Sequence, residues 1–536
     1  METEADIYFL KRRVLSFEFR VLSFALSPPQ SGSKLQPSAF CLLHSAFCPL
    51  PSAFYSKETP LPRIIRQAQP PLEFIPPKLN LSVVKGLQWL LPAIMRSRTA
   101  IRRVEATNVE VLVDLLRQFH EGKIRFLLAF RHPSVNDPFS MAYLLARIVP
   151  KVARQQGVAL RRPIHAHFMY DRGIPLWAGS FMGWLYSQLG GTPIHRGKVD
   201  RVGLRSARDL FANGSLPLAA APEGATNGHT EIVSPLEPGL SQLAFWCVED
   251  LRKANRTENV LVVPIGIQYR YITPPWRAID QLLSQLEADT GLVAPTKHSQ
   301  DAANERMLYG RLYRLGEHLL SLMEQFYSRF YQQPLSTPPS PAQDDRAVAP
   351  SDPAIPLSHE AFAVRLNALM DAALKVAEQY FNLQPKGSVI DRCRRLEQAG
   401  WDYIYREDLK AIEQISPLEH CLADRIAEEA NHRLWHMRMV ESFVAVTGKY
   451  VLEKPSVERF AETTLLMWDM VARIKGENPF DRPKLGRLKA VLTIGQPLSV
   501  SDRWHDYEGN RRNAKQAVMT LTQDLQTALE QMAVRD

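Results

Sequence analysis

The sequence predicts an α/β fold that contains a long, mainly helical region. Short apolar runs alternate with helix-forming segments between about residues 122 and 267, and such alternation is typical of an α/β sandwich. Residues 276–332 and 358–484 then carry apolar side chains at helical spacing. A strand-like run at 490–495 and a helix from about 513 to 532 follow, so strand character returns after the helical region.

The strand candidates are short and apolar. Ile124–Phe130 has the pattern of a strand that is buried on both faces. Asp137 and Pro138 then look like an N-cap followed by a proline at the first helical position, which predicts a helix through about Val149. Further strands are expected at 216–221 and 260–267.

The first 80 residues have a different character from the rest of the chain. The triplet SAF occurs three times between residues 38 and 54, at intervals of seven residues. Prolines interrupt this repeat, and so short a repeat cannot bury an apolar face of its own. Residues 1–80 are therefore expected to be a disordered or low-complexity extension, of which 59–80 is a proline-rich linker.

Two apolar segments have more than one interpretation. Residues 87–95 form a short apolar run with a tryptophan, followed by clustered arginines. This pattern suits either an anchor at a membrane interface or a core helix with a solvated end. Trp177, Phe181, Trp184 and Leu185 have the spacing of one helical face, for which core packing is favoured over an acyl channel or bilayer contact.

Composition narrows the class of partner. The 536 residues carry a net charge of +9, which favours anionic partners. No basic stripe with interleaved aromatics occurs, so an anionic membrane surface is preferred over nucleic acid. No run of about 18 apolar residues occurs, so a peripheral protein on the cytoplasmic side of a membrane is expected, without a spanning helix. The five widely spaced cysteines suggest neither a disulfide framework nor a zinc site.

A histidine and an aspartate form the candidate catalytic pair. His132 follows the predicted strand 124–130, and Asp137 opens the next predicted helix, so the two side chains can meet across the turn. The carboxylate would then fix one tautomer of the imidazole, whose free nitrogen could take a proton from an alcohol. His195 and Asp200 have the same separation, so the spacing by itself is a weak signal; a surface histidine near a helix cap is the plain alternative.

Four segments in order resemble the motifs of the glycerolipid acyltransferase family, whose members include the lysophosphatidic acid acyltransferases. HPSVND at 132–137 resembles the first motif, and GGTPIHR at 190–196 resembles the second. APEGAT at 221–226 and VVPIGI at 262–267 are similar to the third and fourth. Together the four segments span about 135 residues and form a far more specific signal than any one of them.

The resemblance implies a role for each matching residue. His132 would be the general base and Asp137 the group that orients it. The implied substrate-binding residues are Ser134, Arg196, Pro222, Glu223 and Gly224. Arg196 would bind the phosphate of the acceptor, and its alternative is a surface arginine on a turn. Glu223 would accept hydrogen bonds from the acceptor or brace the site, and its alternative is an exposed acid on a turn.

The resemblance also implies an architecture. The family closes with a strand containing Gly-x-Pro and a final helix, and IGQPL at 494–498 and the helix at 513–532 resemble these. A glycerolipid-acyltransferase-like α/β sandwich split by a large, mainly helical insertion is therefore expected. Its parts would be the α/β domain with an amphipathic segment at 81–275, the insertion at 276–484 with a flexible loop at 333–357, and the final strand and helix at 485–536. An independent C-terminal domain is the alternative.

The expected activity is transfer of a fatty acyl group from acyl carrier protein or a coenzyme A thioester to 1-acyl-sn-glycerol 3-phosphate, making phosphatidic acid. No cofactor and no metal are implied. Glycerol 3-phosphate as the acceptor remains open, as does a lipid-binding protein without turnover. A serine hydrolase is disfavoured because the Gly-x-Ser-x-Gly pattern is missing. His432 and His436 are expected to be packing or surface residues.

Overall fold

The computed structural model describes residues 67–195, 200–292, 305–335, 359–409, 415–441, 449–479 and 481–533, within one compact unit that spans Leu61–Asp536. The side chains of Leu176 and Trp177 are not described. Most of the predicted extension 1–80, and of the predicted loop 333–357, lies outside these ranges. Residues 67–80 belong to the folded unit, because Lys78 and Asn80 donate backbone hydrogen bonds to the carbonyls of Ser187 and Gln188.

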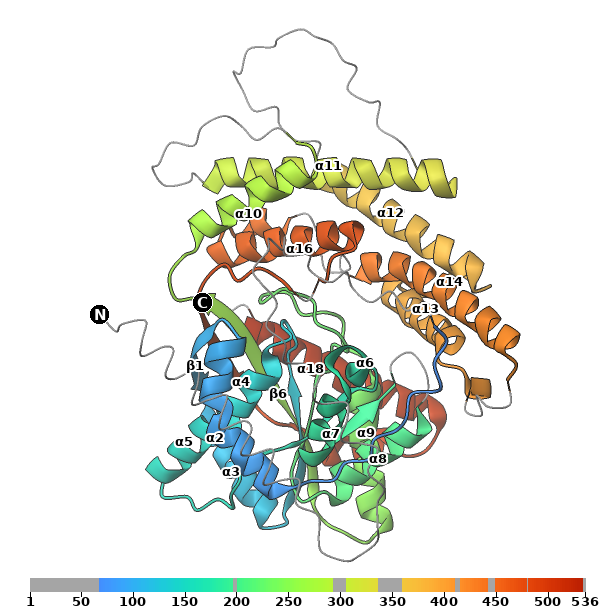
Figure 1. The fold of residues 1–536 in the computed structure, drawn as a ribbon. Coiled ribbons are helices and arrows are strands. Elements are labelled where there is room, and N and C mark those ends of the chain that lie inside the picture. The colour runs from blue at the N-terminus through green and yellow to red at the C-terminus, as the bar shows by residue number, and fades with distance from the viewer. Residues whose placement is uncertain are drawn as a thin grey trace, which may run out of the picture. The chain divides into compact units, whose positions relative to one another are not determined.

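The fold is mixed α/β, and its sheet is mostly parallel (Figure 1). Eight strands of the described residues form this sheet in the order β1-β7-β6-β2-β5-β3-β4, with β8 paired to β6. The strands are β1 (Ile101–Thr107), β2 (Ile124–Phe130), β3 (His167–Asp171), β4 (Gly191–Ile194), β5 (Leu218–Ala220), β6 (Asn259–Tyr271), β7 (Leu488–Ile494) and β8 (Leu498–Ser499). Strands β6, β2, β5, β3 and β4 run parallel, whereas β7 is antiparallel to β6 and parallel to β1.

Helices cover both faces of the sheet. The helices of this part are α2 (Leu81–Arg98), α3 (Val109–His120), α4 (Asp137–Tyr143), the π-helix η1 (Leu144–Ile148), α5 (Val149–Gln155), α6 (Ile174–Ala178), α7 (Ser180–Gln188), α8 (Arg201–Asn213), α9 (Gly239–Lys253), the 3-10 helix η3 (Ser501–Arg503), α17 (Trp504–Tyr507) and α18 (Arg511–Ala533). Helices α2, α3, α4 and α5 share one apolar cluster with β2, β6 and β7, and α8, α9 and α18 share a second cluster with β2, β5 and β6.

Strand β2 lies at the centre of the sheet, between β6 and β5. Its side chains alternate between the two apolar clusters: Phe126 and Leu128 pack into one, and Leu127 and Ala129 into the other. This double burial explains why β2 is apolar from Phe126 to Phe130, although Arg125 interrupts the run near its start. It also fixes the position at which the chain leaves the strand for residues 131–137.

The closing segment of the chain returns to this sheet. β7 is inserted between β1 and β6, and β8 also pairs with β6. The Gly495 amide donates to the Pro264 carbonyl at 2.9 Å. A Cβ at Gly495 would lie 2.7 Å from Pro264 Cγ, so only glycine allows this close approach.

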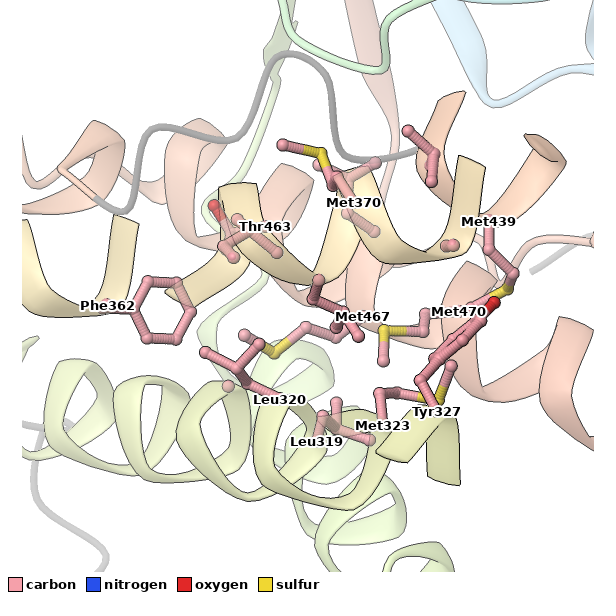
Figure 2. Close-up of a pocket in the computed structure, with 16 residues that line it drawn as sticks. Leu319, Leu320, Met323, Tyr327, Phe362, Met370, Met439, Thr463, Met467 and Met470 are labelled. Atoms are coloured by element: carbon pink, nitrogen blue, oxygen red, sulfur yellow. The ribbon is translucent and has the colours of Figure 1, made fainter. Parts of the chain in front are cut away.

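The residues between β6 and β7 form a helical region with an apolar cluster of its own. Its helices are α10 (Trp276–Asp289), α11 (Glu305–Tyr331), α12 (His359–Tyr380), α13 (Val389–Ile404), α14 (Pro417–Glu441), α15 (Tyr450–Glu453) and α16 (Val457–Lys475). Figure 1 shows them in colours from yellow-green at α10 to orange-red at α16. A pocket lies among α11, α12, α14 and α16, and Figure 2 shows the apolar side chains that line it.

Candidate active site

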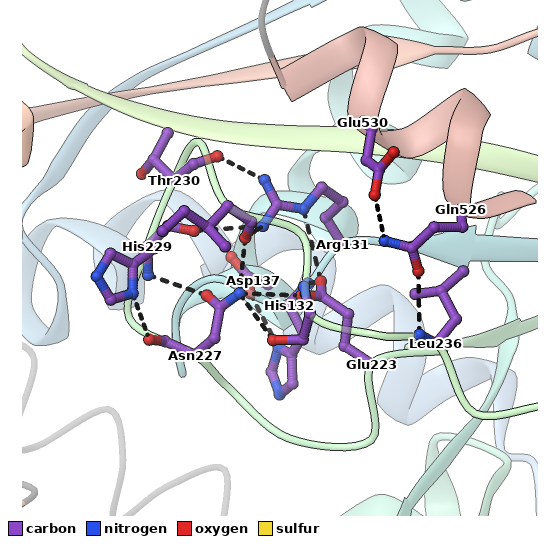
Figure 3. A network of polar contacts seen from close by, with 12 residues as sticks. Arg131, His132, Asp137, Glu223, Asn227, His229, Thr230, Leu236, Gln526 and Glu530 are labelled. Atoms are coloured by element: carbon purple, nitrogen blue, oxygen red, sulfur yellow. Dashed lines mark hydrogen bonds and ion pairs between the residues drawn. The ribbon is translucent and has the colours of Figure 1, made fainter. Parts of the chain in front are cut away.

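The segments after β2 and β5 meet at one edge of the sheet. The two strands are parallel neighbours, with Ala129 beside Ala220, so the chain leaves both strands at the same edge. Residues 131–137 follow β2 and residues 221–238 follow β5. Ligand sites of open α/β sheets lie at the carboxyl ends of the strands, and this is the edge that carries the polar network in Figure 3.

His132 and Asp137 contact each other at this edge. His132 Nδ1 lies 2.9 Å from Asp137 Oδ2. Because a carboxylate accepts, Nδ1 carries the proton and Nε2 keeps its lone pair. The Asp137 side chain is fully buried, whereas 24% of the His132 side chain is exposed. Asp137 is the only hydrogen-bond partner of the His132 ring among the residues that the structure describes, which leaves Nε2 free to face a substrate.

Three groups hold the Asp137 carboxylate. Besides His132, the Ser134 amide donates to Oδ2 at 2.9 Å and the Tyr269 hydroxyl donates to Oδ1 at 2.5 Å. Burial and the neighbouring Asp137 raise the pKa of Tyr269 well above its ordinary value, so its hydroxyl keeps the proton that it donates. Both oxygens of Asp137 therefore have fixed partners, and the carboxylate can turn only by breaking several hydrogen bonds.

The predicted N-cap is wrong by one residue. Asn136 is the N-cap of α4, and Asp137 is its first residue, with Pro138 next. The Asp137 side chain accepts from His132, Ser134 and Tyr269 instead of from the first turn of its own helix. The predicted helix is also longer than expected, because α4 runs through η1 into α5 and ends at Gln155.

The contacts of Glu223 lie within the protein and hold the backbone of His132. Its side chain is fully buried, its Oε1 accepts from the His132 amide at 2.7 Å, and its Oε2 accepts from the Ser234 amide at 3.0 Å. Asn227 Nδ2 donates to the same Oε2 at 3.1 Å, and Arg131 Nε lies 3.5 Å from Oε1. Since both oxygens already have protein partners, these contacts favour the bracing role of Glu223 over direct contact with an acceptor.

The other predicted residues of these two segments have mainly structural contacts. Ser134 Oγ accepts from the Asn136 amide at 3.2 Å, and the Pro222 carbonyl accepts from the Glu237 amide at 2.9 Å. Gly224 has a φ of +71°, and a Cβ there would lie 2.3 Å from Glu237 Oε1. The positive φ favours glycine at this turn, whereas the contact with the flexible end of Glu237 could be relieved by moving that side chain.

Arg131 is central to the network but was not expected from the sequence. Its guanidinium is fully buried and donates to the carbonyls of His229, Thr230 and Ile232. It thereby ties the loop after β5 to the end of β2. Its position directly before His132 in the first motif was the one available signal.

The loop after β5 is also held by distant parts of the chain. The Thr230 amide donates to Glu462 Oε1 of α16 at 3.0 Å, and the Leu236 amide donates to Gln526 Oε1 of α18 at 3.0 Å. Arg394 of α13 lies 3.2 Å from Glu237. The helical region therefore contacts the loop that braces His132.

Burial shifts the pKa values of two titratable groups where the helical region contacts the loop after β5. Burial lowers the pKa of His229 to about 4, and the ring donates from Nδ1 to the Asn227 carbonyl at 2.9 Å. Burial also raises the pKa of Glu462 to about 7, although the Thr230 amide and the Tyr450 hydroxyl donate to its carboxylate. His229 is therefore neutral at pH 7, whereas Glu462 changes its charge near that pH.

The second His-x4-Asp pair has a different structure from the first. Arg196 lies outside the described residues, so the predicted phosphate contact stays a prediction. His195 is described, and its backbone amide donates to Asp200 Oδ2 at 2.9 Å. Asp200 also caps α8 through the Gly203 amide and pairs with Arg172. Its carboxylate thus caps α8 and pairs with an arginine, as the helix-cap alternative predicts. The surface position expected for the histidine is wrong, because His195 is buried.

The expected aromatic face is not one helical face. Gly179, at a φ of +89°, separates α6 from α7, so the spacing from Trp177 to Leu185 does not follow one continuous helix. Phe181 and Trp184 are 58% and 46% exposed, so the prediction of core packing is wrong for them. In α2, Leu91 and Met95 are buried and Trp89 is 65% exposed, so that helix presents both a core face and an exposed tryptophan.

Among the described residues, no group of three or more His, Cys, Asp or Glu side chains is arranged to hold a metal ion. His436 is buried and contacts the Tyr327 hydroxyl at 2.7 Å, in line with the packing role expected for it. None of the described helices is long and apolar enough to cross a membrane. Comparisons with protein-family models, with curated proteins and with solved structures found no match to this chain.

Proposed function

We propose that this protein is an acyltransferase that moves a fatty acyl group from a thioester to the hydroxyl of 1-acyl-sn-glycerol 3-phosphate, which makes phosphatidic acid. The observation that carries the proposal is the His132–Asp137 pair at the carboxyl end of β2, with Nε2 of His132 free among the described contacts. This is the arrangement that general-base catalysis on an alcohol requires.

The reaction needs one proton carrier. His132 Nε2 takes the proton from the acceptor hydroxyl as the oxygen attacks the thioester carbonyl. The tetrahedral intermediate then collapses, the carbon–sulfur bond breaks, and the imidazolium returns the proton to the leaving thiolate. Asp137 holds the ring and stabilises its charged form in between. General-base catalysis of this kind contributes about 10²–10⁴ to the rate.

The surrounding contacts support a preorganised base. Tyr269 and Ser134 fix Asp137, and Glu223 fixes the backbone of His132. A histidine held at its backbone amide and at Nδ1 of its ring loses little freedom when the substrate binds, so positioning adds to the rate. In this proposal Pro222 and Gly224 shape the acceptor pocket, and Arg196 binds the acceptor phosphate as a bidentate fork.

The proposal also covers the domain architecture, the acyl donor and the place where the enzyme works. The α/β part is an acyltransferase-like sandwich, and the helical region is an insertion between its fourth motif and its closing strand. The thioester donor is acyl carrier protein or coenzyme A. The protein works as a peripheral enzyme on the cytoplasmic side of an anionic membrane, where the exposed Trp89 of α2 and the arginines at the end of that helix favour interfacial binding.

The test is an acyl-transfer assay with the full-length protein. Labelled palmitoyl-coenzyme A and palmitoyl-acyl carrier protein are supplied with lysophosphatidic acid or with glycerol 3-phosphate. His132→Ala removes the proposed base, and His505→Ala is the matched control because its side chain is 75% exposed on α17. Phosphatidic acid from the wild type and from His505→Ala, but not from His132→Ala, is the expected result.

The other outcomes separate the alternatives. Lysophosphatidic acid as the first product from glycerol 3-phosphate moves the assignment to a glycerol-3-phosphate acyltransferase. No product, with retained binding to anionic vesicles, favours a lipid-binding protein without turnover. Equal turnover by His132→Ala would mean that the base is elsewhere.

A further inference from the structure

The helical region contains an apolar pocket among α11, α12, α14 and α16. The cavity itself has a volume of about 80 Å³, and the space around it, with the open solvent at its mouth, amounts to about 730 Å³. The cavity is therefore narrow and opens to solvent, which suits a slender group better than a bulky one. Figure 2 shows the labelled methionines and leucines pointing into the same space from facing helices.

The lining offers no free polar partner. Its side-chain oxygens are those of Tyr327 and Thr463, and both are already engaged. The Tyr327 hydroxyl contacts His436 Nδ1 at 2.7 Å, and the Thr463 hydroxyl donates to the Arg459 carbonyl at 2.8 Å. A buried polar ligand group would therefore lack a partner, which is costly, whereas a hydrocarbon chain needs none.

Methionine is frequent in the lining. Five of the lining residues are methionines: Met323, Met370, Met439, Met467 and Met470. An unbranched thioether side chain adopts several shapes and adapts to an irregular apolar ligand. Such a wall can close around chains of different length, which a wall of β-branched side chains does less easily.

A glycine keeps part of the space open. Gly316 lies within α11, a helix of 27 residues, where glycine is unfavourable relative to other residues. A Cβ there would lie 3.2 Å from Met467 Cε and 3.7 Å from Phe362 Cζ, both of which belong to the lining. Any larger side chain at this position therefore points into the pocket.

One wall of the pocket adjoins the candidate active site. Leu466 of α16 lines the pocket, and its Cδ2 would lie 3.4 Å from a Cβ placed on Gly228. Glu462, on the same helix, accepts from the Thr230 amide. Both Gly228 and Thr230 belong to the loop whose carbonyls bind Arg131, so α16 separates the pocket from this loop.

We propose that this pocket binds the aliphatic chain of a fatty acid or of one of its derivatives, with the polar head left at the mouth. The proposal concerns binding alone, so it goes beyond the proposed function and does not depend on turnover. A free fatty acid, an acyl thioester and a lysophospholipid share the required chain, and the experiment distinguishes them.

The test measures saturable binding of cis-parinaric acid, a fatty acid that is itself fluorescent, to the full-length protein below its micelle concentration. Palmitate, palmitoyl-coenzyme A and lysophosphatidic acid compete in separate arms, and the strongest competitor identifies the source of the chain. Gly316→Leu fills the pocket and is expected to weaken binding by about tenfold or more. Gly310→Leu is the matched control: it makes the same change on the same helix, where a Cβ meets nothing within 4 Å.

The outcomes are distinct from those of the acyl-transfer assay. His132→Ala should bind the chain as the wild type does, even if all turnover is lost. Absence of saturable binding by the wild type, or equal loss in Gly310→Leu and Gly316→Leu, overturns the proposal. As a measurement that needs no variant, a photoreactive fatty acid should label peptides from α11, α12, α14 or α16, and labelling confined to other segments also overturns the proposal.

Discussion

The candidate active site and the helical pocket are built on opposite principles. At the end of β2, each oxygen of Asp137 and Glu223 accepts from an identified donor. Two of these hydrogen bonds, from Tyr269 to Asp137 and from His132 to Glu223, join segments far apart in the chain. In the helical pocket the lining has no free polar side chain, and flexible methionines face one another. The candidate active site depends on the directions of its hydrogen bonds, whereas the helical pocket depends on the volume of its apolar side chains.

This difference predicts how each region responds to small chemical changes. Hydrogen bonds are lost when an atom type changes, even if the shape is kept. Apolar packing depends on volume, and a swap that keeps the volume is tolerated. Nearly isosteric substitutions should therefore have large effects at the strand ends and small effects among the helices.

The largest effect is expected for Asp137→Asn. An amide keeps the size of the carboxylate but cannot stabilise an imidazolium, and it can donate to Nδ1 and so impose the wrong tautomer on His132. We expect kcat for acyl transfer to fall by about 10²–10⁴-fold. The free energy of unfolding should also fall, by about 1–3 kcal/mol, because the amide NH2 group cannot accept from the donors that bind one of the carboxylate oxygens. Steady-state kinetics with saturating acceptor measure this fall in kcat. A rise in KM with an unchanged kcat would contradict the assigned role.

The next effect concerns folding. Glu223→Ala leaves the buried Arg131 without its carboxylate and leaves the His132 and Ser234 amides without an acceptor. Loss of one partner of a buried ion pair costs about 3–5 kcal/mol, which urea unfolding can measure. Glu237→Ala is the control on the same loop, where the side chain is 44% exposed and an exposed pair contributes about 1 kcal/mol or less. Equal losses in the two variants would reject the bracing role.

A smaller effect depends on pH. The pKa of Glu462 is raised by burial from its ordinary value of 4.5 to about 7, so the folded state binds the proton more tightly than the unfolded state. The stability that this provides is present below pH 4.5 and is lost as the pH rises through 7. The difference in free energy of unfolding, Glu462→Gln minus wild type, should therefore be more positive at pH 8 than at pH 5 by about 1–3 kcal/mol.

Thermal unfolding of both proteins at the two pH values measures this difference. Glu458→Gln, on the same helix, controls for the removal of a negative charge. A Glu462→Gln effect that is the same at pH 5 and pH 8 would show that the carboxyl does not titrate in this range.

The smallest effect is expected for Met467→Leu in the pocket. The two side chains are similar in volume, and such swaps cost less than about 1.5 kcal/mol. Acyl transfer should stay within about twofold of the wild type, since Met467 lies in the helical pocket and contacts no residue of the His132–Asp137 pair. A loss of activity comparable to that of Asp137→Asn would contradict the prediction that the helical pocket tolerates substitutions that keep the volume.

The sequence predicted the central strands better than the outer ones. β2 has the expected bounds, and β5 and β6 lie where apolar runs indicated strands, because burial on both faces leaves a continuous apolar signal. β1, β3 and β4 were missed. β1 exposes most of its side chains, and β4 has only four residues, so neither carries enough apolar pattern to be detected.

Spacing alone could predict the candidate site only where its residues are close in sequence, and Glu223 was assigned through the resemblance of residues 221–226 to a family motif. His132 and Asp137 are separated by four residues, and a turn between strand and helix is enough to join them. Tyr269 and Arg131 reach their partners across 132 and about 100 positions of the chain, respectively, so no local pattern could assign them. The assignment of an acyltransferase function to this site stays a prediction.

The place of β7 in the sheet has a consequence for biosynthesis. Because β7 lies between β1 and β6, β1 has no partner and β6 has an open edge until residues 488–494 have left the ribosome. Synthesis of residues 272–487 takes roughly 10–40 s at about 5–20 residues per second. During this interval the nascent chain exposes strand edges of the kind that template aggregation. The helical region is therefore synthesised before the strand that completes the sheet.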